Sequence, residues 1–391
     1  MNATLLPLLQ NDAVPMETLH RRYGRLLDPV RVMIGVVPNS FPCLEIWPVG
    51  LRSFNVLIPN FLNLPFSLLG LGAPIAVVSL AMYSASVAAG CAYCSAHCCS
   101  FALRRGASAA SIAGVLDGTS EPGPRAVVEI ARSLSCMPLA VTARQRADLE
   151  AQFPAAQVEW IVLAIAMMGF LNKFMDVVGV ELEPEIAGQA QALIAPSGWR
   201  PGKHFAGTIA GAALPRADSI ARRLGVLRSA PAAISADRKW TAGVPSRWPA
   251  AGEFLRTATG HDFPVLARLR HGRAIRAIAA TLRDNLDAAT SVIGLPLKAQ
   301  LGRVFAEAIG NNALAGEMEV VAQRHPGSVD DPRAQAALRL TRAASSSPAQ
   351  IDSGTVEACG KSGLSAAAVV EIVVWLALLQ MLHRLSAFYR A

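Results

Sequence analysis

Residues 155–178 read AAQVEWIVLAIAMMGFLNKFMDVV. Drawn as a helix, this segment carries apolar side chains in almost every direction, so we expect a central helix buried on all sides. A second segment, VVEIVVWLALLQMLHRLSA at 369–387, aligns with it by pattern. The few polar residues near the end of the first segment, Asn172, Lys173 and Asp176, are predicted to make interface or helix-end contacts. Each half of the chain is therefore predicted to contain one long buried helix.

The composition agrees with a helical protein that has a large core. Of the 391 residues, 52% are hydrophobic, 16% are charged and 6% are aromatic. Alanine and leucine are abundant, which favours helices over sheets. The net charge of +8 comes from scattered arginines, many of them at 216–228 and 268–283. Because no aromatic stacking platforms accompany these arginines, we interpret them as a solvated surface and expect no nucleic-acid partner.

We expect a cytoplasmic protein without a membrane span. Residues 53–103 contain no Asp, Glu, Lys or Arg, but the best apolar stretch within them, 75–90, carries three serines. That stretch is also shorter than the roughly 20 residues that a spanning helix needs. The N-terminus has neither a basic region nor a cleavage motif. Seven cysteines, three of them scattered, fit a reducing compartment with one local thiol site better than a disulfide framework.

The second half of the chain resembles a degraded copy of the first. The segment 128–142 matches 338–352 in its apolar spacing, and 86–105 matches 306–325. In the second pair Gly90 aligns with Gly310, but the cysteines are lost: Asn311 and Leu314 stand where the first copy has Cys91 and Cys94. The second copy is thus predicted to keep the scaffold and to lack the thiols.

These matches define three regions: a first domain at 1–205, a linker with an extra helix at 206–260, and a second repeat at 261–391. Irregular helices and loops are predicted for 15–60, which is rich in proline. The segment 181–215 is rich in glycine, proline and alanine and predicts a linker or extended arm. Helical character is predicted over 264–290 and 297–325.

The candidate chemistry lies in GCAYCSAHCC at 90–99. At about 100° per residue, Cys91, Cys94 and Cys98 share one face of a helix, with His97 at the edge of that face. Three interpretations of this cluster remain open. It can be a redox dithiol, a Cu(I) or Zn(II) site that uses these four side chains, or a set of small buried cysteines in a tight helix contact. No phosphate loop or Ser-His-Asp signature is present, and no cofactor is expected.

The GCAYC motif, the apolar helix before it and the long helix ending in FLNKFMDVVGVEL resemble the carboxymuconolactone decarboxylase superfamily, within it the alkylhydroperoxidase D-like branch. The similarity covers 20–205 and, in degenerate form, 260–391. It implies an all-α fold of two tandem helical bundle domains. It also implies a homo-oligomer, a dimer or trimer, because members of this family usually assemble.

The resemblance further implies catalytic roles. Cys94 would attack a hydroperoxide, Cys91 would resolve the sulfenic acid to a redox-active disulfide, and a protein or low-molecular-weight thiol would reduce it. The chain departs from the family at two places. Ser79 stands where the family has a glutamate base, and Cys98 stands where it has a histidine, so His97 comes one residue early. The candidate catalytic residues are listed as Cys91, Cys94, His97 and Cys98.

The leading functional hypothesis is therefore a thiol-dependent peroxidase or disulfide oxidoreductase. The first alternative is a non-redox biosynthetic enzyme on the same scaffold, where the altered positions would reflect a different substrate. A Cu- or Zn-binding thiol protein is the other alternative.

Overall fold

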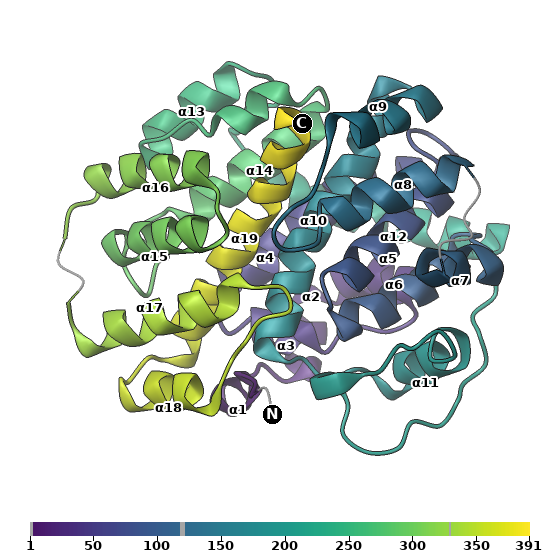
Figure 1. The fold of residues 1–391 in the computed structure, drawn as a ribbon, viewed down its shortest axis with the longest axis horizontal. Helices are drawn as coiled ribbons and strands as arrows, with labels where there is room; N and C mark the ends of the chain where they lie inside the picture. Colours follow the sequence, from purple (N-terminus) through teal and green to yellow (C-terminus); the bar gives the residue numbers. More distant parts are fainter. Residues whose placement is uncertain (1–2, 118–121, 328–329) are drawn as a thin grey trace.

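The chain folds into helices. The computed structural model describes residues 3–117, 122–327 and 330–391, and within those ranges it contains no strand (Figure 1). The prediction of an all-α protein is confirmed. The physical reason is the abundance of alanine and leucine, which lose little side-chain freedom in a helix.

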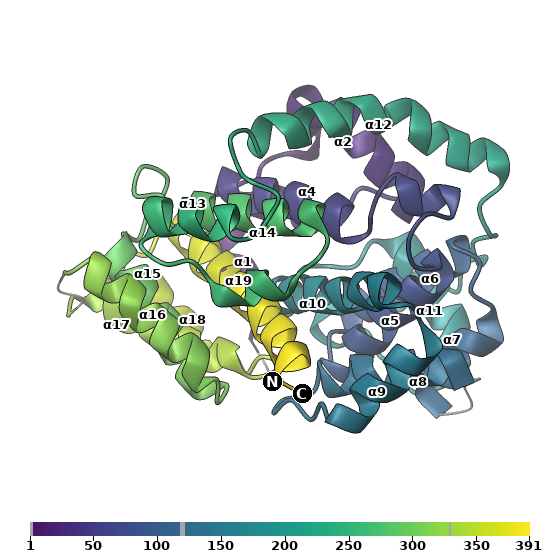
Figure 2. The same ribbon diagram turned by 90° about the horizontal axis from the view of Figure 1, so that it is seen from above.

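Two long helices form the centre of the molecule. Helices α10 (Ala155–Val178) and α19 (Ala366–Arg390) pack along each other, as the views in Figures 1 and 2 show. The contact is close at Gly169, where a Cβ atom would lie 3.1 Å from the carbonyl oxygen of Gln380. In length and composition both helices could cross a membrane, yet 94% and 89% of their apolar windows are buried inside the protein. The predicted pair of buried helices is confirmed.

A hairpin of two helices packs beside α10. It consists of α5 (Ile75–Ala88) and α6 (Ala92–Arg104), which meet at Gly90. Three shorter helices extend from this hairpin and complete the first bundle. They are α7 (Ala109–Asp117), α8 (Pro122–Ser133) and α9 (Ala143–Gln152).

The second repeat contains a matching hairpin. The helical character predicted over 297–325 belongs to two helices, α15 (Leu295–Ala308) and α16 (Asn312–Arg324). The break lies at Gly310, whose φ is +70°, close to the +67° of Gly90. Glycine accepts this left-handed conformation without the steric cost that other residues incur. Helices α17 (Pro332–Ser345) and α18 (Ser353–Lys361) complete this bundle.

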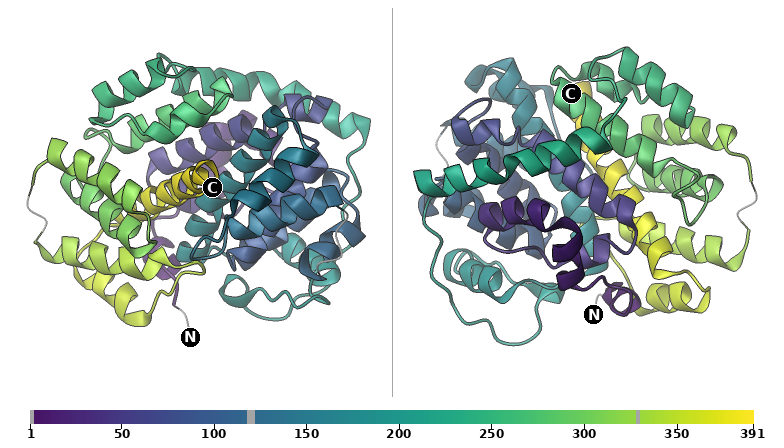
Figure 3. Two further views of the ribbon diagram at one scale, coloured as in Figure 1. Left: turned by 45° about the horizontal axis from the view of Figure 1, so that its top comes forward. Right: turned by 180° about the vertical axis from the view of Figure 1, so that it is seen from behind.

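Further helices cover the two bundles on one side. Figure 2 shows α2 (Met16–Ile34) and α12 (Ile220–Trp240) as an outer layer above α4 (Pro48–Phe61) and α14 (Gly272–Asn285). In the rear view of Figure 3, α12 lies across α2 and α4. The sequence predicted irregular helices and loops over 15–60, and this needs correction, because two regular helices, α2 and α4, occupy most of the segment. Both tolerate an internal proline, Pro29 in α2 and Pro59 in α4.

The expectations for two other segments also needed correction. The predicted linker at 181–215 contains α11 (Pro184–Leu193) and the 3-10 helix η2 (Gly202–His204). The predicted helix over 264–290 begins as the 3-10 helix η3 (Pro264–Arg268) and continues as α14 after an extended His271. The remaining helices are short, apart from α13. They are α1 (Leu6–Leu9), α3 (Ser40–Leu44), η1 (Phe66–Leu69) and α13 (Ala250–Thr259).

Candidate functional site

Cys91 stands at the start of α6 and caps it. Its backbone is extended, with φ −89° and ψ 97°, so it precedes the helix and does not belong to the face predicted for it. The backbone N–H of Cys94 donates to the Cys91 sulfur at 3.4 Å. An N-cap sulfur in this position accepts from one of the first-turn N–H groups that have no partner within the helix.

The turn before Cys91 is pressed against the second repeat. A Cβ atom on Gly90 would lie 2.9 Å from the Cδ atom of Pro348. Any side chain there would push the two repeats apart, and φ at Gly90 is also positive. Glycine at position 90 therefore serves both the turn and the inter-repeat contact.

The cysteines of the cluster are buried thiols. Cys91 and Cys94 have 0% and 4% of their surface exposed, and no disulfide joins them. Burial, followed by the hydrogen bond with the Cys91 thiol, raises the pKa of Cys94 well above its usual value. Burial also raises the pKa of Cys98 to about 12, although the Ser86 hydroxyl, 3.7 Å from its sulfur, acts in the opposite direction. Cys94 and Cys98 are therefore protonated at rest.

A carboxylate that the sequence analysis missed holds His97. The Nε2 atom of His97 lies 2.7 Å from Oε2 of Glu183. The other oxygen of Glu183 accepts from the backbone N–H of Asn39 at 2.6 Å and from the Tyr93 hydroxyl at 3.1 Å. Burial alone would raise the pKa of Glu183, but His97 and the backbone N–H of Asn39 outweigh it and hold that pKa below its ordinary value. Glu183 is thus an ion buried beside an imidazole.

Glu183 comes from the segment that was predicted to be a linker. It is the residue before Pro184, the first residue of α11, in the sequence ELEPE at 181–185. The available signal was this acidic cluster directly after the long buried helix. Ser79, the position where the family resemblance places a carboxylate, instead donates its hydroxyl to the carbonyl of Ile75 at 2.6 Å.

Aromatic rings fix the orientation of His97. The ring of Tyr93 lies 4.5 Å from that of His97 and 5.8 Å from that of His204, measured between centroids. His204 is held in turn, because its Nδ1 atom lies 2.7 Å from the carbonyl oxygen of Val180. Tyr93 therefore packs against His97 and also donates its hydroxyl to Glu183.

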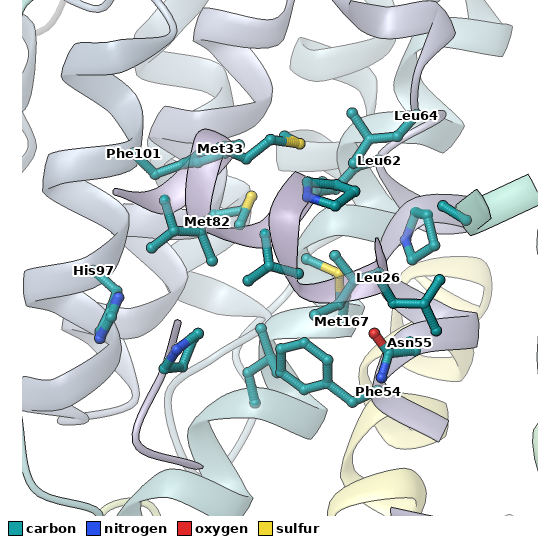
Figure 4. A pocket seen from close by; sticks show the side chains of 18 of the residues that line it. Leu26, Met33, Phe54, Asn55, Leu62, Leu64, Met82, His97, Phe101 and Met167 are labelled. Carbon is teal, nitrogen blue, oxygen red and sulfur yellow. The ribbon is translucent and has the colours of Figure 1, made fainter. Parts of the chain in front are cut away.

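An apolar cavity of about 200 Å³ opens beside this cluster. Its walls come from α2, α4, α5, α6, α10 and α12, and its lining includes Cys94, His97 and Cys98 but not Cys91. In Figure 4 His97 lies on one side of the cavity and Asn55 and Leu64 on the other. The structure thus brings three of the four predicted residues, Cys94, His97 and Cys98, to the cavity wall, and it leaves Cys91 outside the lining.

Most of the remaining lining consists of flexible or branched apolar side chains. Methionines recur among them, and these adapt easily to the shape of a ligand. They are listed as Met33, Met82, Met167, Met168 and Met175.

The arrangement does not favour the metal-site interpretation. Across the described ranges, no group of three or more His, Cys, Asp or Glu side chains is placed to hold a metal ion. Cys91 does not line the cavity, and the Cys98 sulfur lies 4.0 Å from the Met168 sulfur.

The start of α16 in the second repeat has the same helix-capping geometry as the start of α6, but no cysteine stands there. Asn311 caps α16, and its side-chain oxygen accepts from the backbone N–H of Leu314 at 3.2 Å. The amide nitrogen of Asn311 lies 2.9 Å from Nδ1 of His383. Burial lowers the pKa of His383 to about 3, so this histidine is a neutral acceptor. Asn311 and Leu314 thus occupy the positions at the start of α16 that Cys91 and Cys94 occupy at the start of α6.

Comparison with known proteins adds no relative to this description. No model of a known protein family matches the chain, and no curated protein matches it significantly.

Proposed function

We propose that this protein is a thiol-dependent oxidoreductase on an alkylhydroperoxidase D-like scaffold. Cys94 is its attacking thiol, and Cys91 is its resolving thiol. One observation carries the proposal: Cys94 and His97 share the wall of an apolar cavity, while Cys91 is outside the lining and its sulfur accepts from the Cys94 backbone N–H at the helix cap. Substrate therefore meets Cys94 first.

The reaction follows from this order. The Cys94 sulfur attacks the terminal oxygen of a hydroperoxide, forming an S–O bond while the O–O bond breaks. The alkoxide leaves and takes up the proton that Cys94 has lost, which gives an alcohol and a sulfenic acid. Cys91 then attacks the Cys94 sulfur, an S–S bond forms, and the oxygen departs as water. An external dithiol returns two electrons and two protons to the disulfide.

His97 and Glu183 provide the proton path. Residues three apart on a helix are neighbours, so the His97 ring can accept the Cys94 proton and deliver it to the leaving oxygen. The Glu183 carboxylate, 2.7 Å from His97, stabilises the imidazolium that forms in between. Because burial keeps Cys94 protonated at rest, this base is needed for the attack. Cys98 keeps its proton and contributes to the cavity wall.

The cavity indicates the class of substrate and reductant. Its apolar lining favours a hydroperoxide or disulfide with an apolar body over hydrogen peroxide. Cys91 has no exposed surface, whereas Cys94 faces the cavity. A small dithiol that enters the cavity and attacks the Cys94 sulfur therefore fits better than a protein that docks on Cys91.

A non-redox enzyme is the second candidate, and the His97–Glu183 pair favours it. A buried imidazole held by a carboxylate beside a cavity can act as a general base without any thiol. In that case Cys94 would serve only as a wall residue, and the protein would not consume thiols.

A thiol titration separates the two candidates. Wild-type protein, Cys94→Ser and the control Cys359→Ser, which alters a buried cysteine of α18, are titrated before and after one equivalent of cumene hydroperoxide. The proposal expects wild type and Cys359→Ser to lose two thiols each and Cys94→Ser to lose none. Wild-type protein that keeps all its thiols would overturn the redox proposal in favour of the second candidate.

A further inference from the structure

A short loop presents three large apolar side chains to solvent. Phe66, Leu69 and Leu71 are 45%, 57% and 56% exposed, and they belong to the 3-10 helix η1 and the turn after it. Single exposed apolar residues are ordinary, but a group of them on one surface marks a binding site. Elsewhere in the described ranges the large exposed apolar residues are separated in the sequence: Leu214, Ile234, Val292 and Val320.

The exposure of this loop is not the result of a loose backbone. The backbone N–H of Leu71 donates to the carbonyl of Phe66 at 3.1 Å, and the amide nitrogen of Asn63 donates to the carbonyl of Leu71, also at 3.1 Å. Leu68 lies between the exposed side chains and is buried, so it anchors the loop to the core. The fold therefore holds the exposed apolar side chains in place, which lowers the cost of binding through them.

The cavity beside His97 extends to this loop. Leu64, two residues before Phe66, lines the cavity and lies across it from His97 in Figure 4. Arg273 also lines the cavity, and its guanidinium carbon lies 5.4 Å from the centroid of the Phe66 ring. Ile234 of α12 is both a lining residue and 39% exposed. The apolar wall of the cavity thus continues into the exposed apolar loop.

A basic segment packs against the loop. Arg273 donates from Nη2 to the carbonyl of Leu64 at 2.7 Å. Two residues earlier, the ring of His271 stacks on the ring of Trp160, with 3.9 Å between centroids. A Cβ atom on Gly72, at the end of the loop, would lie 3.3 Å from the same Trp160 ring. These contacts place the segment that carries His271 and Arg273 at the edge of the loop.

The charge at this edge is positive. Residues 53–103, which include the loop, contain no Asp, Glu, Lys or Arg. The neighbouring segment 268–276 contains four arginines and no acidic residue, and Arg268 and Arg270 are exposed. Glu159, which accepts from the backbone N–H of Arg270 at 2.9 Å, is buried. The two segments therefore bring only positive charge to the surface.

An anionic lipid bilayer matches all of these features. Its acyl region receives apolar side chains, its headgroups attract arginines, and it supplies apolar molecules to a cavity that opens beside the loop. A second copy of this chain matches less well. In a symmetric dimer each patch meets its own copy, so the arginines of segment 268–276 would approach arginines.

We propose that residues 66–71 and the arginines of segment 268–276 form a docking surface for an anionic lipid bilayer, on which the protein lies without spanning it. The binding does not depend on the proposed reaction. One consequence does rest on the proposed function: hydroperoxides dissolved in the bilayer would enter the cavity next to Leu64.

Flotation with lipid vesicles tests the proposal. Full-length protein is mixed with vesicles of phosphatidylcholine alone or of phosphatidylcholine and phosphatidylglycerol in equal parts. Leu69→Glu/Leu71→Glu removes the apolar side chains, and Arg268→Gln/Arg270→Gln removes two exposed cations. The control Val292→Glu/Val320→Glu makes the same charge change at two exposed apolar residues outside the loop. All of the substituted side chains are exposed, so the variants should keep their fold.

Wild-type protein and the valine control are expected to float with the mixed vesicles and less well with phosphatidylcholine alone. The leucine variant should bind the mixed vesicles at least about tenfold more weakly, because carboxylates replace side chains that enter the acyl region. The arginine variant should lose at least about fivefold, the effect of one basic residue at an anionic surface. Added salt should weaken wild-type binding in the same direction.

Wild-type protein that stays in solution with both kinds of vesicle would overturn the proposal. Leucine or arginine variants that bind as wild type does would overturn it too, and so would equal binding to both kinds of vesicle. A wild-type dimer that the leucine variant converts to a monomer, without vesicle binding, would assign the loop to a second copy instead. Vesicle binding by a protein that keeps its thiols with cumene hydroperoxide would support the docking surface and remove the proposed function.

Discussion

At the scale of single residues, the site depends on a buried carboxylate. Glu183 accepts hydrogen bonds from the Asn39 backbone and the Tyr93 hydroxyl and lies against His97. The cysteines and His97 could be predicted as a cluster from the sequence, because they lie within nine residues and their spacing on a helix determines which of them are neighbours. Glu183 could not be found in this way, since its contact with His97 depends on how α11 folds back onto α6.

Replacing Glu183 by glutamine tests how much this ion contributes to stability. The pKa of Glu183 is lowered in the folded protein, so its charge stabilises the fold at pH values above its ordinary pKa. That contribution disappears as the pH falls through the lowered folded value. Glu183→Gln should therefore lower the free energy of unfolding by about 1–3 kcal/mol at pH 7, and the difference should shrink below pH 5.

Urea unfolding at several pH values measures this difference. Glu181→Gln is the matched control, because Glu181 lies two residues away with its side chain exposed. The control should change stability by no more than about 0.5 kcal/mol. A Glu183→Gln protein as stable as wild type at pH 7 would contradict the description of Glu183 as a stabilising buried ion.

At the scale of helices, the two repeats are joined by contacts between α10 and the segment that follows α17. Lys173 binds the carbonyls of Ala344 and Ser346, and the carboxylate of Asp176 accepts from the backbone N–H of Ala349. The last carbonyls of a helix have no partner within it, so Lys173 acts as a cap supplied by another helix. The predicted helix-end role of Lys173 and Asp176 is confirmed.

Removing this cap should destabilise the whole protein. Lys173→Met keeps the apolar stem but leaves buried carbonyls without a donor, which should cost about 2–4 kcal/mol. Urea unfolding at pH 7 measures the effect, and Lys361→Met, at an exposed lysine of α18, is the control. Equal stability of Lys173→Met and wild type would mean that water satisfies these carbonyls instead.

The positions of the buried helices could be predicted from the apolar pattern of the sequence, but the breaks between helices could not. Residues 155–178 were predicted with the bounds that α10 has, because apolar side chains on all sides leave no other buried arrangement. The division of 297–325 into two helices does not follow from the apolar pattern, which continues through Gly310, because a single glycine does not end a helix by composition alone. The regular form of the helices within 15–60 was not predicted, because their prolines lie inside helices that packing stabilises.

At the scale of the whole molecule, the cavity is made by the covering layer. Helix α12 comes from the region between the repeats and lies across α2 and α4, so it closes the cavity from outside (Figure 3). No single repeat contains all the walls. This property was out of reach of the sequence, where 206–260 was predicted to be a linker with one extra helix.

Filling the cavity from α12 should separate substrates by size. Ala233 lines the cavity, and Ala233→Phe places a ring within it. Under the proposed function, kcat/KM for cumene hydroperoxide should fall at least about tenfold, which corresponds to about 1.4 kcal/mol. The value for hydrogen peroxide should change little. Ser235→Phe, on the exposed side of α12, is the control. An equal loss for both peroxides would argue against the cavity as the substrate site.

The unlike caps of the two matching hairpins, Cys91 on α6 and Asn311 on α16, have a consequence for how such a protein can change over generations. In an assembly of identical chains every substitution occurs in all copies, so a residue that improves one site alters its symmetric mate as well. Here both halves are encoded in one polypeptide, and each position can vary alone. One half can then specialise in chemistry while the other specialises in support, a division of labour that identical subunits do not permit.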